Sequence, residues 1–79
     1  MELKKAFGII LRKLRLNKSL SQEELAFQSG IHRTYISLLE RGIKSPSLNI
    51  LFKLSNSLEI PPSKIILKVE NLYKKDKNL

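Results

Sequence analysis

The sequence predicts an all-α fold in which five short helices surround one hydrophobic core. Apolar residues recur at steps of three and four along the chain, as on helices with one buried face, and no alternating strand pattern competes. Capping and turn residues divide this pattern into five stretches. The chain has 79 residues, so we expect a single domain, with its core over about residues 3–72.

The first two helices are separated by a capping motif. An apolar stripe predicts a first helix that ends near residues 17–19. Ser21 and Glu24 then have the Ser-x-x-Glu spacing of a capping box, in which each side chain accepts a hydrogen bond from the other residue's backbone N–H. The second helix is therefore expected over about residues 22–29, and Gly30 is expected to end it in the left-handed conformation.

The third and fourth helices are bounded by turn residues in the same way. We expect the third helix over about residues 33–41, with His32 at or near its cap and Gly42 after its end. Ser47 is expected to cap a fourth helix, whose leucines share one face.

The fifth helix follows a pair of prolines. Pro62 or Ser63 can open it, because the missing N–H of a proline costs nothing in a first turn. Its apolar stripe consists of Ile65, Ile66, Val69 and Leu72. Residues 74–79 have little to bury, so they are expected to form a flexible basic tail.

The composition indicates a polyanionic partner and a reducing compartment. Fifteen Lys and Arg residues against seven Asp and Glu residues leave a formal net charge of +8, which favours DNA, RNA or an anionic membrane surface as a partner. The absence of cysteine excludes a disulfide or a thiolate metal site and fits the cytoplasm. No apolar run is long enough to span a bilayer and no signal peptide is recognisable, so we expect a complete, soluble, unexported chain without a membrane partner.

Catalysis is not expected from this sequence. The adjacent carboxylates of Glu23 and Glu24 fall in a capped first turn, where they interact favourably with the helix dipole. The sequence has no nucleophile–base set, no metal-ligand cluster and no phosphate-cradling glycine loop. We therefore expect no cofactor, no metal and no small-molecule ligand.

Residues 22–41 have the spacing of two helices that meet at a tight turn. Ala26 is small enough for a close helix contact, and Gly30 makes the turn, where a Cβ is expected to push the helices apart. Ile36 is expected to face inward and meet Leu25. This spacing predicts a helix-turn-helix, a motif whose second helix can enter the major groove of DNA.

The chain resembles the lambda-repressor-like, or Xre-type, helix-turn-helix family over the stretch LSQEELAFQSGIHRTYISLLERGIKSPSLNILFKLSNSLEI. The matching features are SQEELA, the glycine eight residues after Gln22, the ERG that ends the third helix and the PSL that opens the fourth. The resemblance extends from about Phe7 to Leu67 and implies the five-helix fold of that family. Within the family, HRTYISLLERG most resembles the controller proteins of restriction–modification systems, which are small dimeric regulators.

The resemblance implies that the third helix enters the major groove and reads bases with its exposed face. Arg33 is the best candidate, because a guanidinium can bond O6 and N7 of a guanine together; the alternative is a phosphate contact. Thr34 can meet a thymine methyl or a phosphate, and Ser37 is small enough to allow close approach. Tyr35 either reaches a phosphate or a base edge or packs on the following loop.

Further residues are expected to contact the DNA backbone. Gln22 resembles the phosphate-contacting glutamine of the family, against the alternative of a solvated side chain. His32 is either a helix cap or a phosphate contact. Arg41, Lys44 and Ser45 belong to a loop that runs beside the sugar–phosphate backbone in this family, so their contribution to affinity should weaken as salt rises.

Two features of the resemblance concern the scaffold. Arg15 and Glu40 match positions where family members often hold a semi-buried ion pair that orients the third helix against the first. The alternative is two ordinary exposed charges. Ser19 and Glu59 stand where glycine is common, so the local geometry of two loops is open.

A second copy of the chain is an expected partner. One helix contacts too few base pairs to select a site in a genome, whereas a two-fold dimer presents two helices about one DNA turn, ~34 Å, apart. The interface is expected on the fourth and fifth helices, whose surplus apolar residues are Ile50, Phe52, Ile65, Ile66, Val69 and Tyr73.

The predicted function is that of a cytoplasmic, sequence-specific transcriptional regulator that binds double-stranded DNA at a palindromic operator as a homodimer. An autoregulatory controller protein is the favoured type, and a phage-type repressor or an antitoxin is the alternative. RNA polymerase is a further candidate partner. A protein-interaction module on the same fold is the main alternative from another class, and RNA binding ranks third because the chain lacks an aromatic-studded sheet or a GXXG loop.

Overall fold

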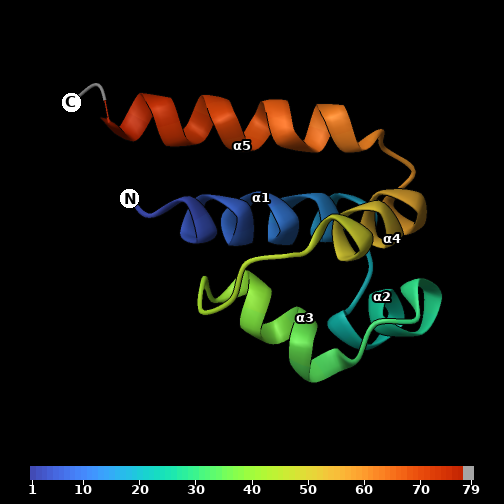
Figure 1. Cartoon of the computed structure of the whole chain (residues 1–79). Coiled ribbons are helices and arrows are strands. Elements are labelled where there is room, and N and C mark those ends of the chain that lie inside the picture. Colours follow the sequence, from blue (N-terminus) through green and yellow to red (C-terminus); the bar gives the residue numbers. More distant parts are fainter. Residues whose placement is uncertain (78–79) are drawn as a thin grey trace.

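A computed structural model describes residues 1–77, with side chains described through residue 75. Within this range the chain forms five helices and no strand (Figure 1). The helices are α1 (Leu3–Asn17), α2 (Gln22–Ser29), α3 (Arg33–Glu40), α4 (Leu48–Leu58) and α5 (Pro62–Lys77). The predicted all-α architecture of five helices is therefore confirmed.

The central element of the fold is α1. It packs against both α3 and α5, while α2 contacts α3 and α4. In Figure 1, α5 and the α2–α3 pair accordingly lie on opposite sides of α1. This arrangement leaves the outward side of α3 free of other helices.

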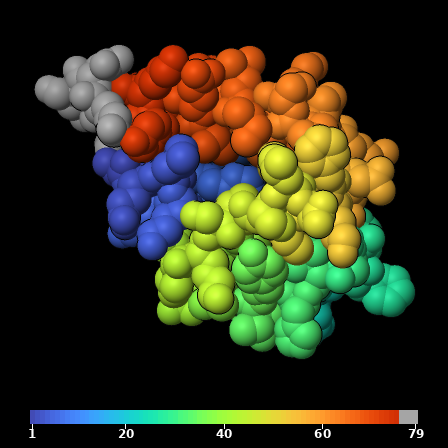
Figure 2. All heavy atoms as spheres, viewed as in Figure 1, coloured from blue at the N-terminus to red at the C-terminus, as the bar shows by residue number. Residues whose placement is uncertain are grey.

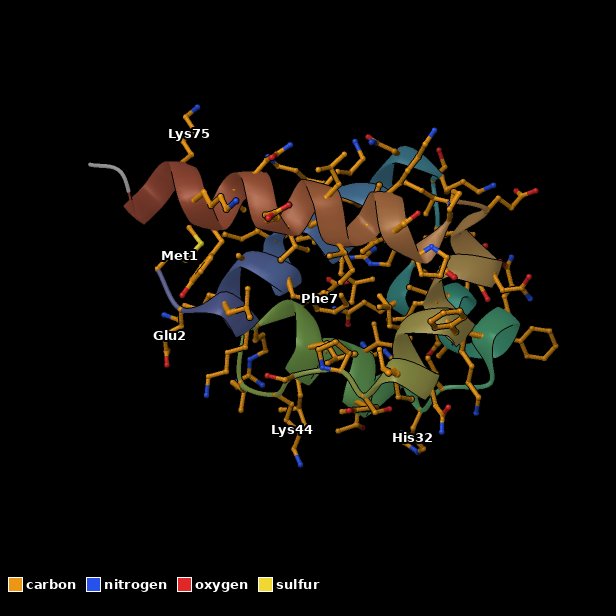
Figure 3. The ribbon with its side chains drawn as sticks, turned by 45° about the horizontal axis from the view of Figure 1, so that its top comes forward. Met1, Glu2, Phe7, His32, Lys44 and Lys75 are labelled. Atoms are coloured by element: carbon orange, nitrogen blue, oxygen red, sulfur yellow. The ribbon has the colours of Figure 1, made fainter. Side chains whose placement is uncertain are left out.

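One hydrophobic core holds the five helices together, and every helix contributes to it. Its largest fully buried side chains are those of Leu11, Leu25, Ile36, Leu39, Leu54 and Ile65. Phe7 of α1 is also buried in this core, where Figure 3 shows it between the helices. Burial of one such side chain contributes about 1.5–3 kcal/mol. Helices of eight to sixteen residues are marginal by themselves, so this shared core is their chief source of stability.

The helix boundaries follow the predicted caps. Ser21 Oγ accepts a hydrogen bond from the Glu24 backbone N–H at 3.0 Å, and the Ser21 N–H donates to Glu24 Oε1 at 2.9 Å, which completes the capping box. Ser47 caps α4 through its side chain, as the sequence predicts. Helix α3 ends at Glu40, one residue before its predicted end, and Arg41 is its C-cap.

Close helix packing occurs at Gly8 rather than at Gly30. Gly30 has the predicted left-handed conformation, with a φ of 71°, but a Cβ at this position would meet no atom within 4 Å. The expectation that such a Cβ would push the helices apart is therefore wrong, and the constraint at Gly30 is its backbone angle. A Cβ at Gly8 would lie 2.5 Å from the carbonyl oxygen of Leu39, so Gly8 is what allows α1 to reach the end of α3.

The two loops without the expected glycine adopt a glycine-like conformation. Ser19 has a φ of 57° and Glu59 a φ of 56°. In this left-handed region, a residue with a Cβ such as Ser19 loses roughly 1–2 kcal/mol. The Glu59 carboxylate forms an ion pair with Lys18, which brings the two loops together. The ends of α1 and α4 thus hold local backbone strain side by side.

The fifth helix is longer than the sequence predicts. Residues 74–77 continue α5 instead of forming a flexible tail, and Lys74 Nζ pairs with Glu70 Oε2 at 3.0 Å across one helical turn. Residues 78 and 79, the rest of the predicted tail, lie outside the described residues. Even with this extension, none of the helices within residues 1–77 combines the length and the apolar surface that crossing a bilayer requires.

Candidate nucleic-acid interface

The outward side of α3 presents three of the residues predicted to read bases. Arg33 and Thr34 are exposed and Ser37 is half-buried, whereas Ile36 and Leu39 are buried in the core. With about 3.6 residues per turn, positions 33, 34 and 37 share roughly a quarter of the helix circumference. The structure therefore brings Arg33, Thr34 and Ser37 together on one face.

This face continues into the loop that follows α3. Figure 3 shows His32 and Lys44 pointing away from α5, while Lys75 lies on the opposite side of the molecule. Figure 2 shows α3 and the loop after it forming one edge of the molecule. The residues gathered here, which we call the α3 surface, are His32, Arg33, Thr34, Ser37, Arg41, Lys44 and Ser45. It carries three permanent positive charges and no carboxylate.

Tyr35 occupies the edge of the α3 surface rather than its centre. The ring is half-buried against the core, and the hydroxyl donates a hydrogen bond to the Ser45 carbonyl oxygen at 3.3 Å. This is the packing alternative for Tyr35, in which the side chain connects α3 to the following loop. The same contact keeps the hydroxyl beside the α3 surface.

His32 is the N-cap of α3. Its Nδ1 accepts a hydrogen bond from the Thr34 backbone N–H at 3.3 Å. While Nδ1 accepts this hydrogen bond, the ring can donate only through its Nε2–H. The exposed ring leaves that Nε2–H available as a donor on the α3 surface, so the capping role and a phosphate contact are compatible.

The predicted pair of Arg15 and Glu40 forms between α1 and α3. Arg15 Nε donates to Glu40 Oε2 at 2.6 Å and Arg15 Nη2 donates to Oε1 at 2.9 Å, which is the bidentate geometry of a strong charge pair. The two side chains are only 9% and 3% exposed. The hydrogen bonds to Glu40 raise the pKa of Arg15 above its ordinary value, although burial opposes this shift.

Gln22 is attached to the same ion pair. As the first residue of α2 it is half-buried, and its Nε2 donates to Glu40 Oε1 at 3.1 Å. Arg15 completes the network through Nη1, which donates to the Leu20 carbonyl oxygen at 2.8 Å in the loop before α2. The fully solvated alternative for Gln22 is thus excluded, because its amide is held from below.

A shallow hollow of about 300 Å³ lies at the N-terminus of α2, beside this network. It is lined by Arg15, Ser21, Gln22, Glu23 and Arg33. Backbone N–H groups and the helix dipole favour an anion at such a place, and the Arg33 guanidinium adds a positive charge. The Glu23 carboxylate at the rim acts against this. The hollow adjoins the α3 surface, so an anion bound here would lie next to the base-reading face.

The predicted dimer residues divide into three groups in the structure. Ile65 and Val69 are buried in the core of the chain itself, so their assignment to the dimer interface is wrong. Ile50 and Tyr73 are half-buried against that core. Phe52 and Ile66 are 59% and 48% exposed, which makes them accessible to a second chain. The helical period alone could not separate Ile65 from Ile66, because both fall near one apolar stripe.

Sequence reasoning missed two features that shape this site. Gly8 fixes the crossing of α1 and α3, and the signal for it was a glycine inside a strongly helical pattern, which usually has a packing reason. The hydrogen bond from Gln22 to Glu40 has no sequence signal, because the two residues are eighteen positions apart and meet only through the packing of three helices.

The fold and the α3 surface define a class of protein. The chain belongs to the helix-turn-helix family, whose model matches residues 11–65 and so includes all of α2, α3 and α4. The family assigned from the resemblance is confirmed.

Relatives of the chain give a narrower comparison. It is 46% identical over 61 residues to the control protein C.BamHI of Bacillus amyloliquefaciens, covering 76% of this chain and 75% of that protein. The structure of the restriction-modification controller protein C.AhdI from Aeromonas hydrophila matches with a TM-score of 0.76 and 45% identity, over 78% of this chain and 94% of that one. The controller protein C.Esp1396I, solved as a tetramer in complex with its natural 35 base-pair operator, matches with a TM-score of 0.80 and 28% identity over 90% and 93%.

Proposed function

We propose that this protein is a sequence-specific DNA-binding transcriptional regulator that binds a palindromic operator as a homodimer and acts as the controller protein of a restriction–modification system. The observation that carries the proposal is the α3 surface, where an exposed arginine and small polar side chains lie on one face of the second helix of a helix-turn-helix. The similarity to C.BamHI and C.AhdI favours the controller type over a phage-type repressor or an antitoxin.

In this function the α3 surface enters a major groove. Arg33 lies in the first turn of α3 and bonds a guanine through O6 and N7. Thr34 and Ser37 make the remaining close contacts on the same face. Tyr35 acts mainly by holding the loop after α3, and its hydroxyl can donate to a phosphate only if it releases the Ser45 carbonyl.

A second set of residues contacts the sugar–phosphate backbone. Arg41 and Lys44 are exposed beyond the end of α3, and each phosphate that they neutralise releases counterions. Gln22, His32 and Ser45 contribute further hydrogen-bond donors to the backbone. Arg41 and Lys44 therefore set most of the salt dependence, whereas Arg33 sets the specificity.

The dimer forms through exposed apolar side chains of α4 and α5. Phe52 and Ile66 remain from the predicted set, and Leu48 and Leu67 are also exposed, at 74% and 52%. Leu48 and Phe52 lie one helical turn apart on α4, and a contiguous exposed apolar patch is typical of an interaction surface. The regulator acts in the cytoplasm and without a cofactor. Its own concentration sets how much dimer forms, so dimer formation and operator binding are coupled.

One observation supports a protein partner in addition. Phe27 of α2 is 90% exposed, beside Glu23 and Glu24. This patch lies on a different helix from the α3 surface, so a DNA-bound regulator could use it to contact a protein such as RNA polymerase. A Phe27→Ser variant that binds the operator normally but no longer regulates transcription in a reconstituted assay would support this role, whereas unchanged regulation would exclude it.

The main proposal is tested by selection from a pool of random duplex DNA, with wild type and Arg33→Ala at two salt concentrations. We expect an enriched palindrome with half-sites about one helical turn apart, and relaxed selection at one base pair per half-site for Arg33→Ala. Exposed Lys53→Ala, on α4, is the matched control and should leave the selected sequence unchanged. Bulk, salt-sensitive binding without enrichment would contradict the proposal.

A further inference from the structure

The Glu40 carboxylate connects three helices below the α3 surface. It accepts two hydrogen bonds from Arg15 of α1, at 2.6 and 2.9 Å, and one from the Gln22 amide of α2, at 3.1 Å. The Glu40 side chain is only 3% exposed, so it cannot itself contact a large ligand. Gln22 is half-buried and lines the hollow at the N-terminus of α2. The amide of Gln22 therefore lies between the buried carboxylate and the outside.

A carboxylate below an amide determines which way the amide faces. An ionised carboxylate only accepts hydrogen bonds, so the NH₂ group of Gln22, and not its carbonyl oxygen, has to face Glu40. The two N–H bonds of that group diverge, so one can donate to Glu40 while the other stays available. Phosphate oxygens are also acceptors, and a glutamine held in this orientation offers them a donor without first having to rotate.

The buried charges of the network cancel below the hollow. The guanidinium of Arg15 compensates the Glu40 carboxylate at close range, so the pair adds no net negative charge below the hollow. Arg15 also holds the Leu20 carbonyl oxygen at 2.8 Å, two residues before Gln22. The pair thus fixes both the side chain of Gln22 and the backbone that leads to it.

We infer that Glu40, with Arg15, is a positioning residue for phosphate binding: it holds the Gln22 amide so that its second N–H points to one phosphate of each DNA half-site. This inference rests on the proposed function, because it takes DNA as the ligand. The Arg15–Glu40 pair, which orients α3, thereby also sets where the DNA backbone lies. Base contacts and backbone contacts are then both positioned by the same ion pair.

The test uses the selected operator with single phosphates replaced, one at a time, by uncharged methylphosphonates. Its main variant replaces the pair as a unit, Arg15→Met with Glu40→Leu. Exchanging a buried pair for apolar residues of similar size usually preserves folding, and it leaves the net charge of the protein unchanged. Gln22→Leu removes the amide itself, and Gln28→Leu, on the same helix and exposed, is the matched control.

We expect the wild type to lose about tenfold in affinity when one particular phosphate of each half-site is neutralised. Gln22→Leu and the paired replacement should both abolish the sensitivity to that same phosphate, while Gln28→Leu should keep it. Adding Gln22→Leu to the paired replacement should weaken binding no further. A role in folding alone would instead lower affinity at all phosphates evenly and leave the sensitivity pattern intact, which would overturn the inference.

Two further outcomes separate the inference from the proposed function. If Gln22→Leu leaves every phosphate sensitivity unchanged while a palindrome is still selected, the inference fails and the regulator stands. If no operator is selected at all, both fail. An NMR measurement on free wild type provides an independent check: one of the two Gln22 side-chain amide hydrogens should exchange more slowly than those of Gln28, and equal fast exchange would contradict the hydrogen bond to Glu40.

Discussion

At Gly8 a single missing side chain determines how closely two helices approach. A Cβ at this position would meet the carbonyl oxygens of Leu39 and Glu40 at 2.5 and 2.6 Å, and backbone atoms cannot move aside as a flexible side chain can. The last turn of α3 carries both the ion pair and the start of the loop with Arg41. Gly8 therefore contributes to the position of the α3 surface without being part of it.

We predict that Gly8→Ala lowers the free energy of unfolding by about 1–2 kcal/mol, because overpacking outweighs the gain of roughly 1 kcal/mol in helix propensity. Chemical denaturation measures this difference. Arg12→Ala, at an exposed position of the same helix, is the control and should change stability by less than about 0.5 kcal/mol. A stabilised Gly8→Ala protein would show that propensity alone governs this site.

Ser19 illustrates the opposite case, in which a side chain is present where glycine suits the backbone better. Its φ of 57° disfavours a Cβ. We predict that Ser19→Gly raises the free energy of unfolding by about 0.5–1 kcal/mol. Relief of the backbone strain stabilises the folded state, and the greater entropy of glycine in the unfolded chain offsets part of that gain. Ser63→Gly, in the first turn of α5, is the matched control and should destabilise the protein. Equal effects of the two substitutions would contradict a strained Ser19.

At the scale of one element, α2 depends on its cap more than on its own apolar face. It has eight residues, and Leu25 is the one that the structure buries fully among them. The capping box satisfies two backbone groups at the end of the helix that faces the hollow. Its loss would loosen the first turn of α2, and with it Gln22.

We predict that the capping box gives the protein an acid-sensitive contribution to stability. The hydrogen bonds from the backbone and side chain of Ser21 hold the pKa of Glu24 below its ordinary value. This contribution is therefore present above the unfolded-state pKa and is lost as pH falls through the lower folded-state pKa. In thermal melts, the difference in midpoint between wild type and Glu24→Ala should be largest near pH 7 and should shrink below about pH 4. A difference independent of pH would exclude the role of the ionised carboxylate.

At the scale of the whole molecule, α2, α4 and α5 each expose large apolar side chains that lie outside the core. Phe52 and Ile66 lie on α4 and α5, whereas Phe27 lies on α2. A 79-residue chain buries a limited core, and self-association buries additional apolar area. The dimer thus serves both stability and the recognition of two half-sites.

We predict that wild type sediments as a dimer at micromolar concentration and that Phe52→Lys sediments as a monomer. The far-ultraviolet circular dichroism spectrum should stay unchanged, because Phe52 is 59% exposed in the single chain. Phe27→Lys, at a position that is 90% exposed on another helix, is the matched control and should remain dimeric. A monomeric wild type, or a dimeric Phe52→Lys protein, would contradict the assignment of this face.

Local signals account for much of what could be predicted. The capping box at Ser21, the glycine turn after α2 and the start of α5 near Pro62 each depend on residues within a few positions of one another, so the sequence alone places the helices. The outward direction of Arg33 and Thr34 follows from the same period that buries Ile36. The pair of Arg15 and Glu40 was predicted only through the family resemblance.

By itself, the sequence determined the order of the helices, where each begins and the polar face of α3, because hydrogen bonding and amphipathic periodicity act over one or two helical turns. The tertiary structure alone decided that Gly8 is the point of closest approach, that Ile65 and Val69 belong to the core, and that Gln22 is held by Glu40. Each of these depends on the angles at which helices cross, which arise from the packing of side chains distant in the chain and leave no periodic trace in it.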